Sequence, residues 1–188
     1  MTCADDLYRW GMSIAQFDTV LINGSVGTGK TTTAERLGGE LERFGIPGAV
    51  IDADWLRRSW PAPASDPFRT TVALENMQAI TANFRRAGAR VVVVATVVET
   101  LEELRRTNAA LASRRLLHVR LTATSDAVLP RLTRRHDDDE AALYWHTQRH
   151  PELARTLDRA GFTDELLIDT THKRTPEVVQ EILQTVVV

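Results

Sequence analysis

Short apolar runs alternate along this chain with longer segments in which apolar residues recur at helical spacing. The apolar runs predict five strands, at residues 19–23, 49–51, 90–95, 116–121 and 166–168. The third run is apolar on both faces, which is typical of a central strand in a parallel sheet. The periodic segments predict helices at residues 31–44, 70–87, 99–111, 125–135, 139–160 and 176–187. We expect Ser125 to cap the fourth helix and Pro176 to lie in the first turn of the last.

Strands that alternate with helices predict a three-layer α/β/α fold, in which a five-stranded parallel sheet is covered on both faces. We expect a single domain over residues 19–188, preceded by an N-terminal helix or arm at residues 1–18. In sheets of this kind, ligands bind at the carboxyl ends of the strands. The segments that directly follow the predicted strands are therefore where functional residues are expected.

A glycine-rich loop follows the first predicted strand and leads into a helix. Residues 24–31 read Gly-Ser-Val-Gly-Thr-Gly-Lys-Thr and fit the P-loop pattern G-x-x-x-x-G-K-[ST]. Backbone N–H groups in such a loop surround phosphate oxygens, Lys30 would reach the β- and γ-phosphates, and the Thr31 hydroxyl would ligate Mg²⁺. We expect bound Mg²⁺ and ATP or GTP as co-substrate. The candidate nucleotide-binding residues here are Gly24, Ser25, Val26, Gly27, Thr28, Gly29, Lys30, Thr31 and Thr32.

Two carboxylates, Asp52 and Asp54, follow the second predicted strand. We assign Asp52 to the metal site together with Thr31, and Asp54 to the acceptance of a proton from an acceptor hydroxyl. The alternative for either carboxylate is a helix N-cap. After the strand at 91–94 no acidic residue occurs before Glu99, so a Walker-B aspartate is missing at that strand end. This favours a kinase over an ATPase motor.

Arg131 and Arg135 lie four residues apart on a predicted helix and face the same way. Guanidinium groups there could form a lid, over about residues 129–150, that stabilises the charge of a transferring phosphoryl group. The alternative is a solvated basic helix end. His146 and His150 have the same spacing but lack the glutamate of a zinc-protease helix, so we expect a surface or packing role for both.

The segment at residues 53–70 combines aromatic side chains with arginines and prolines. Aromatic rings beside arginine suit a planar or anionic acceptor, although they could equally form a small hydrophobic cap.

Composition excludes several classes of protein. The 188 residues carry a net charge of −2, which argues against a general nucleic-acid or membrane surface. The single cysteine, Cys3, allows neither an intrachain disulfide nor a cysteine metal cluster. The longest apolar run is too short to span a bilayer and the N-terminus is acidic, so we expect a cytoplasmic protein without nucleic-acid or membrane partners. The sequence is compatible with both a monomer and a homodimer.

These motifs resemble the small-molecule kinases of the P-loop superfamily, which include adenylylsulfate, gluconate and shikimate kinases and chloramphenicol phosphotransferase. Residues 52–57 resemble the D-G-D-x-x-R segment of adenylylsulfate kinases, which implies that Asp54 and Arg57 face the acceptor. The pair Arg131 and Arg135 resembles the lid helix of the group. Residues 169–171 resemble the last-strand segment that leads to the loop over the nucleotide base, which adds Thr171 to the nucleotide-binding residues.

The resemblance implies a P-loop NTPase fold of the nucleoside- and shikimate-kinase type and transfer of the γ-phosphoryl group of ATP or GTP to a hydroxyl of a small molecule. The acceptor could be nucleoside-like, sugar-like or an antibiotic. The alternative is a nucleotide-binding regulator or GTPase-type switch, but the D-x-x-G and N-K-x-D motifs of a GTPase are missing at the expected places. The candidate catalytic residues are Lys30, Asp54, Arg131 and Arg135. The candidate substrate-binding residues are Asp54, Trp55, Arg57 and Glu99.

Overall fold

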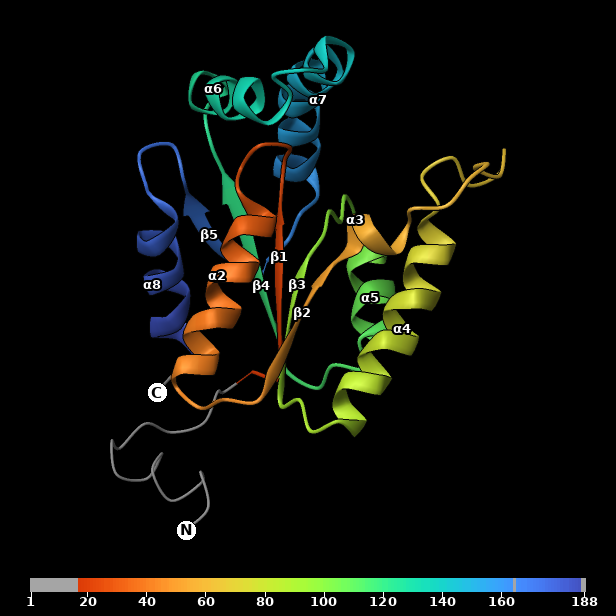
Figure 1. Ribbon diagram of the computed structural model, residues 1–188, viewed down its shortest axis with the longest axis vertical. Coiled ribbons are helices and arrows are strands. Elements are labelled where there is room, and N and C mark those ends of the chain that lie inside the picture. Colours follow the sequence, from red (N-terminus) through yellow and green to blue (C-terminus); the bar gives the residue numbers. More distant parts are fainter. Residues whose placement is uncertain (1–16, 164, 187–188) are drawn as a thin grey trace.

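The computed structural model describes residues 17–163 and 165–186, which contain one five-stranded sheet (Figure 1). The strand order is β2–β3–β1–β4–β5, and every neighbouring pair is parallel. The strands are β1 (Thr19–Gly24), β2 (Gly48–Asp52), β3 (Val91–Ala95), β4 (Leu116–Thr122) and β5 (Glu165–Asp169). This arrangement confirms the predicted parallel α/β fold, and the predicted arm at residues 1–18 falls almost wholly outside the described residues.

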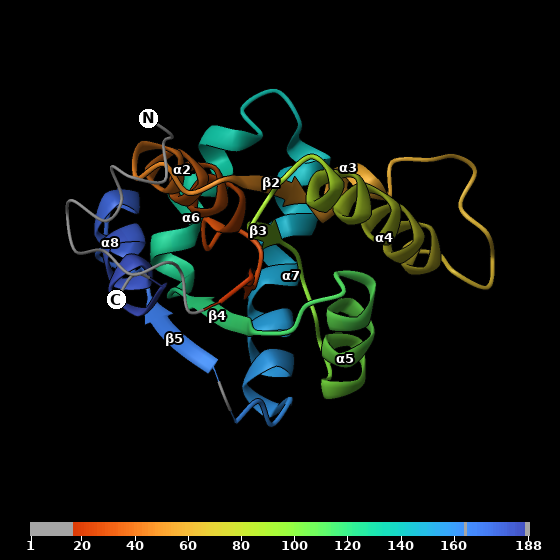
Figure 2. The ribbon, with the colours of Figure 1, turned by 90° about the horizontal axis from the view of Figure 1, so that it is seen from below.

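Helices cover both faces of the sheet (Figure 2). One face carries α2 (Lys30–Arg43) and α8 (Thr175–Val186), and the other carries α4 (Thr70–Arg86) and α5 (Leu101–Ala110). Side chains alternate across a strand. Accordingly Val20 and Ile22 of β1 belong to the core with α2 and α8, while Leu21 belongs to the core with α4.

The remaining helices lie at the carboxyl ends of the strands. A single turn, α3 (Ala53–Leu56), follows β2, and α6 (Ser125–Arg135) with the beginning of α7 (Glu140–Arg159) stands above β1 and β4 (Figure 1). The predicted cap of α6 was wrong by one residue. Thr124 has an extended backbone and its hydroxyl accepts from the N–H of Ala127, whereas Ser125 is already helical.

Within residues 17–163 and 165–186, no helix combines the length and apolar character that a bilayer crossing requires.

Candidate active site

The P-loop closes tightly because its glycines take backbone angles that other residues rarely adopt. Gly24 and Gly27 have φ values of 146° and 77°. A Cβ on Gly24 would lie 2.5 Å from the carbonyl oxygen of Leu121, and a Cβ on Gly27 would lie 2.5 Å from the side chain of Val128. Any side chain at either position would therefore push the loop away from β4 or from α6.

Lys30 lies at the start of α2 with its Nζ donating to the carbonyl of Ser25 over 3.0 Å. Burial lowers the pKa of the Lys30 ammonium to about 8, against the opposite effect of the carboxylates of Asp54 and Asp52. The positive charge of Arg135 lowers this pKa further. Near pH 8 both charge states of Lys30 are therefore populated, and an anionic phosphate in the loop would favour the charged one.

The hydroxyl of Thr31 donates to Oδ2 of Asp52 over 2.7 Å at the foot of the loop. The other oxygen of Asp52 accepts from the backbone N–H of Asp54 and caps α3, so this carboxylate also has the role of an N-cap. Within the described part of the chain, no group of three or more histidine, cysteine, aspartate or glutamate side chains is placed to hold a metal alone. Two hard oxygen ligands fit Mg²⁺, which proteins often bind through one or two side chains together with substrate phosphates.

Two cavities meet at the P-loop. The first, which we call the P-loop cleft, has a volume of about 760 Å³. It is lined by residues 26–33, Asp54, Arg131, Leu132, Arg134, Arg135, Thr170, residues 173–176 and Val178. The second, the α4–α7 cavity, has a volume of about 230 Å³. It is lined by Val26, Lys30, Ala53, Asp54, Arg57, Phe68, Thr70, Ala73, Leu74, Met77, residues 96–99, Glu103, Arg106, Thr107, Trp145, His146, Arg149 and Leu153.

Three residues line both cavities, namely Val26, Lys30 and Asp54. A phosphate held at Lys30 in the P-loop cleft would therefore face a molecule in the α4–α7 cavity with Asp54 beside it. The Asp54 side chain is 73% exposed to solvent, so its carboxylate is free to contact such a molecule.

The walls of the α4–α7 cavity differ in character. Helix α4 contributes apolar side chains, including Leu74 and Met77. Other parts of the lining carry charged pairs: Arg149 donates to Glu99 over 2.6 Å, and Arg57 lies 3.7 Å from Asp54. A ligand there would find both an apolar surface and polar partners, as small-molecule sites usually offer.

Arg131 connects α6 to the P-loop and to the segment after β5. Its guanidinium donates to the carbonyl oxygens of Gly27 and Thr170, at 3.4 and 2.6 Å, and to the Thr170 hydroxyl at 3.2 Å. Together with Arg135 it adds positive charge to the P-loop cleft.

The structure brings most of the predicted site residues together and places a few elsewhere. Trp55 is 67% exposed and lies outside the α4–α7 cavity, with its ring 4.3 Å from the guanidinium of Arg58. Thr171 bonds to Asp169, and its neighbour Thr170 lines the P-loop cleft instead. Gly24 and Ser25 are buried beneath the cleft.

The sequence pattern predicted packing or surface roles for the two histidines of α7, and the structure shows what each one contacts. His146 lines the α4–α7 cavity. His150 is buried against the P-loop, where its carbonyl oxygen accepts from the Ser25 hydroxyl over 2.7 Å and its Nδ1 lies 2.9 Å from the carbonyl oxygen of Val26. The shared spacing placed them on one face, but nothing in the sequence indicated what that face contacts.

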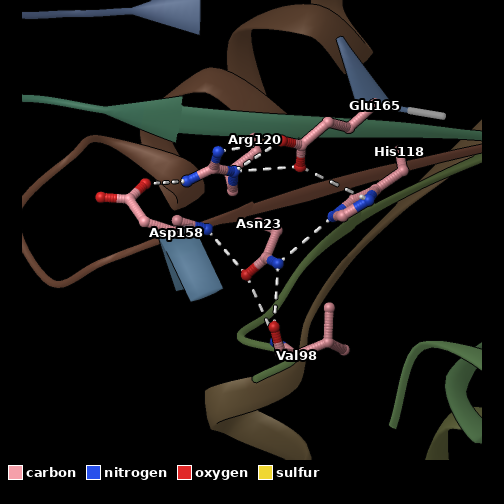
Figure 3. A network of polar contacts seen from close by, with 7 residues as sticks. Asn23, Val98, His118, Arg120, Asp158 and Glu165 are labelled. Carbon is pink, nitrogen blue, oxygen red and sulfur yellow. Dashed lines mark hydrogen bonds and ion pairs between the residues drawn. The ribbon is translucent and has the colours of Figure 1, made fainter. Parts of the chain in front are cut away.

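Asn23, the last residue before the loop, was also missed. Its oxygen accepts from the backbone N–H groups of Gly24 and Val98, and its amide nitrogen donates to the Val98 carbonyl (Figure 3). The amide thus fixes Val98, in the segment that follows β3, against the P-loop. The next residue, Glu99, belongs to the wall of the α4–α7 cavity.

A polar network continues from Asn23 below the site, and all its members except the exposed Asp158 are largely buried (Figure 3). His118 of β4 receives a hydrogen bond from Asn23, and its Nδ1 lies 4.0 Å from Glu165. Arg120 forms ion pairs with Glu165 at 2.9 Å and with Asp158 at 2.7 Å. These contacts tie β4, β5 and α7 together under the P-loop.

Comparison with known proteins is consistent with this geometry. A family described as an AAA domain matches residues 20–146, which include the whole P-loop. No curated protein sequence matches the chain significantly.

Solved structures share the fold. A gluconokinase from Sinorhizobium meliloti 1021 superposes with a TM-score of 0.60 at 20% identity, over 89% of this chain and 90% of that one. The tunicamycin resistance protein of Deinococcus radiodurans gives 0.58 at 23% identity, over 88% and 93%. Shikimate kinase from Acinetobacter baumannii gives 0.60 at 18% identity, over 90% and 93%. At these identities the similarity shows the fold.

Proposed function

The chain belongs to the AAA-domain family that matches residues 20–146, and on this premise we propose that it is a phosphotransferase. It moves the γ-phosphoryl group of ATP or GTP to a hydroxyl group of a small molecule. The P-loop cleft holds the nucleotide and the α4–α7 cavity holds the acceptor. The acceptor-binding segment is formed by residues 53–70, and the lid is formed by residues 129–150.

The observation that carries this proposal is the junction of the two cavities at Lys30 and Asp54. A nucleotide switch or a hydrolase needs room only for a water molecule beside the γ-phosphate. Here a second cavity with an apolar wall and charged partners opens at that point, which favours transfer to a bound acceptor.

The side chains take the following roles in the proposed reaction. The acceptor oxygen forms a bond to the γ-phosphorus, the bond from that phosphorus to the β–γ bridging oxygen breaks, and Asp54 accepts the hydroxyl proton. Lys30, Arg131 and Arg135 stabilise the charge on the phosphate oxygens. Thr31 and Asp52 would hold Mg²⁺, which when bound neutralises charge on the β- and γ-phosphates.

The acceptor is a small hydroxyl compound, either nucleoside-like or sugar-like. The volume of about 230 Å³ and the mixed walls of the α4–α7 cavity support this class. Structures named gluconokinase and shikimate kinase share the fold. Because a tunicamycin resistance protein shares it too, hydroxyl-bearing antibiotics belong among the candidates.

A mass-spectrometric screen tests the proposal. The protein is incubated with Mg²⁺, ATP or GTP and a panel of nucleosides, sugars, sugar acids, shikimate, adenylylsulfate and hydroxyl-bearing antibiotics. A product about 80 mass units heavier than one acceptor, which corresponds to one phosphoryl group, supports the proposal and identifies the acceptor class. A parallel sample of Lys30→Ala controls for contaminating kinases. Tight nucleotide binding without any product would favour a regulatory nucleotide-binding protein instead.

A further inference from the structure

His150 joins helix α7 to the P-loop through buried contacts. The exposed fractions of His150 and Ser25 are only 3% and 2%. The Ser25 hydroxyl donates to the His150 carbonyl oxygen over 2.7 Å. On the ring, Nδ1 lies 2.9 Å from the carbonyl oxygen of Val26 and 3.1 Å from the Ser25 hydroxyl oxygen.

The hydrogen-bond partners define which ring nitrogen carries the proton. The Val26 carbonyl can only accept, so Nδ1 must donate. The Ser25 hydroxyl already donates to the His150 carbonyl, so its oxygen is free to accept from the same Nδ1–H. All three contacts are satisfied together when Nδ1 carries the proton. The His150 ring is then bonded to Val26 and Ser25 of the P-loop, and the His150 carbonyl oxygen is bonded to Ser25 as well.

The two ends of this contact lie in different parts of the site. Val26 lines both cavities, at the point where they meet. On α7, Arg149 and His146 line the α4–α7 cavity, and so does Trp145, whose ring packs edge-on against His146 at 4.8 Å. A shift of the Val26 peptide therefore acts directly on the helix that forms one wall of that cavity.

From this geometry we propose that His150 is a positioning residue that couples nucleotide binding in the P-loop cleft to the α7 wall of the α4–α7 cavity. The inference rests on the proposed function in that the nucleotide occupies the cleft. When the loop amides close around phosphates, the Val26 carbonyl moves with them, and the buried His150 contact carries the movement to α7. Because coupling between sites is reciprocal, an acceptor in the cavity changes the affinity for the nucleotide by the same factor by which the nucleotide changes the affinity for the acceptor.

The fluorescence of Trp145 tests this coupling without knowledge of the acceptor. Trp145 is made the only tryptophan by changing Trp10, Trp55 and Trp60 to phenylalanine. Its emission is recorded while Mg²⁺ with ATP, or with GTP, is added, and nucleotide binding is measured separately by calorimetry. We expect emission to change with the same midpoint as calorimetric binding.

Two substitutions at His150 separate coupling from packing. In His150→Asn the side-chain nitrogen takes roughly the position of Nδ1 and still donates to Val26, whereas His150→Leu fills similar space without a donor. We expect His150→Leu to bind nucleotide but lose the Trp145 response, and His150→Asn to keep it. If His150→Leu does not fold, as judged by thermal unfolding, Ser25→Ala removes the second contact and should weaken the response.

Several outcomes would overturn the inference. These are nucleotide binding without a Trp145 response in the parent, an undiminished response in the nucleotide-bound His150→Leu or Ser25→Ala protein, or an equal loss in His150→Asn and His150→Leu. Absence of calorimetric binding of both ATP and GTP would instead contradict the proposed function itself.

Discussion

The side-chain amide of Asn23 donates a hydrogen bond to Nε2 of His118 over 3.2 Å, and both residues are fully buried. The Asn23 oxygen accepts from two backbone N–H groups, so its nitrogen must face the ring. Nε2 is therefore an acceptor, and the imidazole is neutral with its proton on Nδ1. Burial lowers the pKa of His118 to about 4, and the charge of Arg120 adds to this although Glu165 acts in the opposite direction.

This neutral histidine makes stability dependent on pH. Its pKa in the folded protein lies below the unfolded value of 6.5, so between these values the unfolded chain binds a proton that the folded protein does not. We expect the free energy of unfolding to fall as the pH drops through this range, by up to about 1.4 kcal/mol per pH unit from this group. Urea unfolding at several pH values measures the slope.

His118→Gln is the matched variant for this experiment. A glutamine oxygen can take the place of Nε2 and accept from Asn23, but it does not titrate. The variant should lose stability less steeply between neutral and acidic pH. Equal slopes in the two proteins would show that His118 does not titrate as the structure implies.

Removal of the lysine and of the proposed base should have different consequences. Lys30→Ala should abolish phosphoryl transfer and weaken nucleotide binding, because the ammonium contacts phosphate in both the ground state and the transition state. Asp54→Asn should abolish transfer yet retain nucleotide binding, because its role lies with the acceptor proton. Product formation and calorimetric binding are compared with those of Glu42→Gln, a change to an exposed carboxylate of α2. Turnover of Asp54→Asn near that of the parent would exclude Asp54 as the base.

The hydrogen bond between Thr31 and Asp52 predicts a magnesium-dependent effect on binding. Asp52→Asn should weaken nucleotide binding when Mg²⁺ is present and change it little when the metal is removed with EDTA, because the carboxylate acts through the ion. Calorimetric titrations under the two conditions measure the difference. An equal loss in both would indicate that Asp52 supports the loop or α3 rather than the metal.

The fold and the phosphate site could be predicted from the sequence because their signals are local. Apolar runs mark the strands, and the glycine spacing of residues 24–31 marks the loop. The contacts of α7 were not predictable in this way. Helical spacing places His146 and His150 on one face, but only the folded chain shows that the face meets the P-loop, where partners for the polar atoms make burial of His150 tolerable.

The acceptor segment shows a second limit. The sequence assigned Asp54 and Arg57 to the acceptor through a motif resemblance, and Trp55 as an aromatic side chain beside arginine. On the helical turn of α3, residues three apart share a side while adjacent residues point apart. Asp54 and Arg57 therefore meet at the cavity, and Trp55 lies outside it. Asn23 carries no sequence signal at all, because its role depends on the separate segment at Val98.

The lowered pKa of Lys30 predicts that nucleotide binding takes up a proton near pH 8. With a pKa of about 8, a large fraction of the free protein holds neutral Lys30 at that pH, and bound phosphate charge raises the pKa. Affinity should therefore fall as the pH rises above 8, and the calorimetric enthalpy at pH 8 should depend on the ionisation enthalpy of the buffer. Because the Asp54 carboxylate raises this pKa, Asp54→Asn should shift the fall in affinity to lower pH. A binding enthalpy at pH 8 that is the same in every buffer would mean that nucleotide binding does not change the protonation of Lys30.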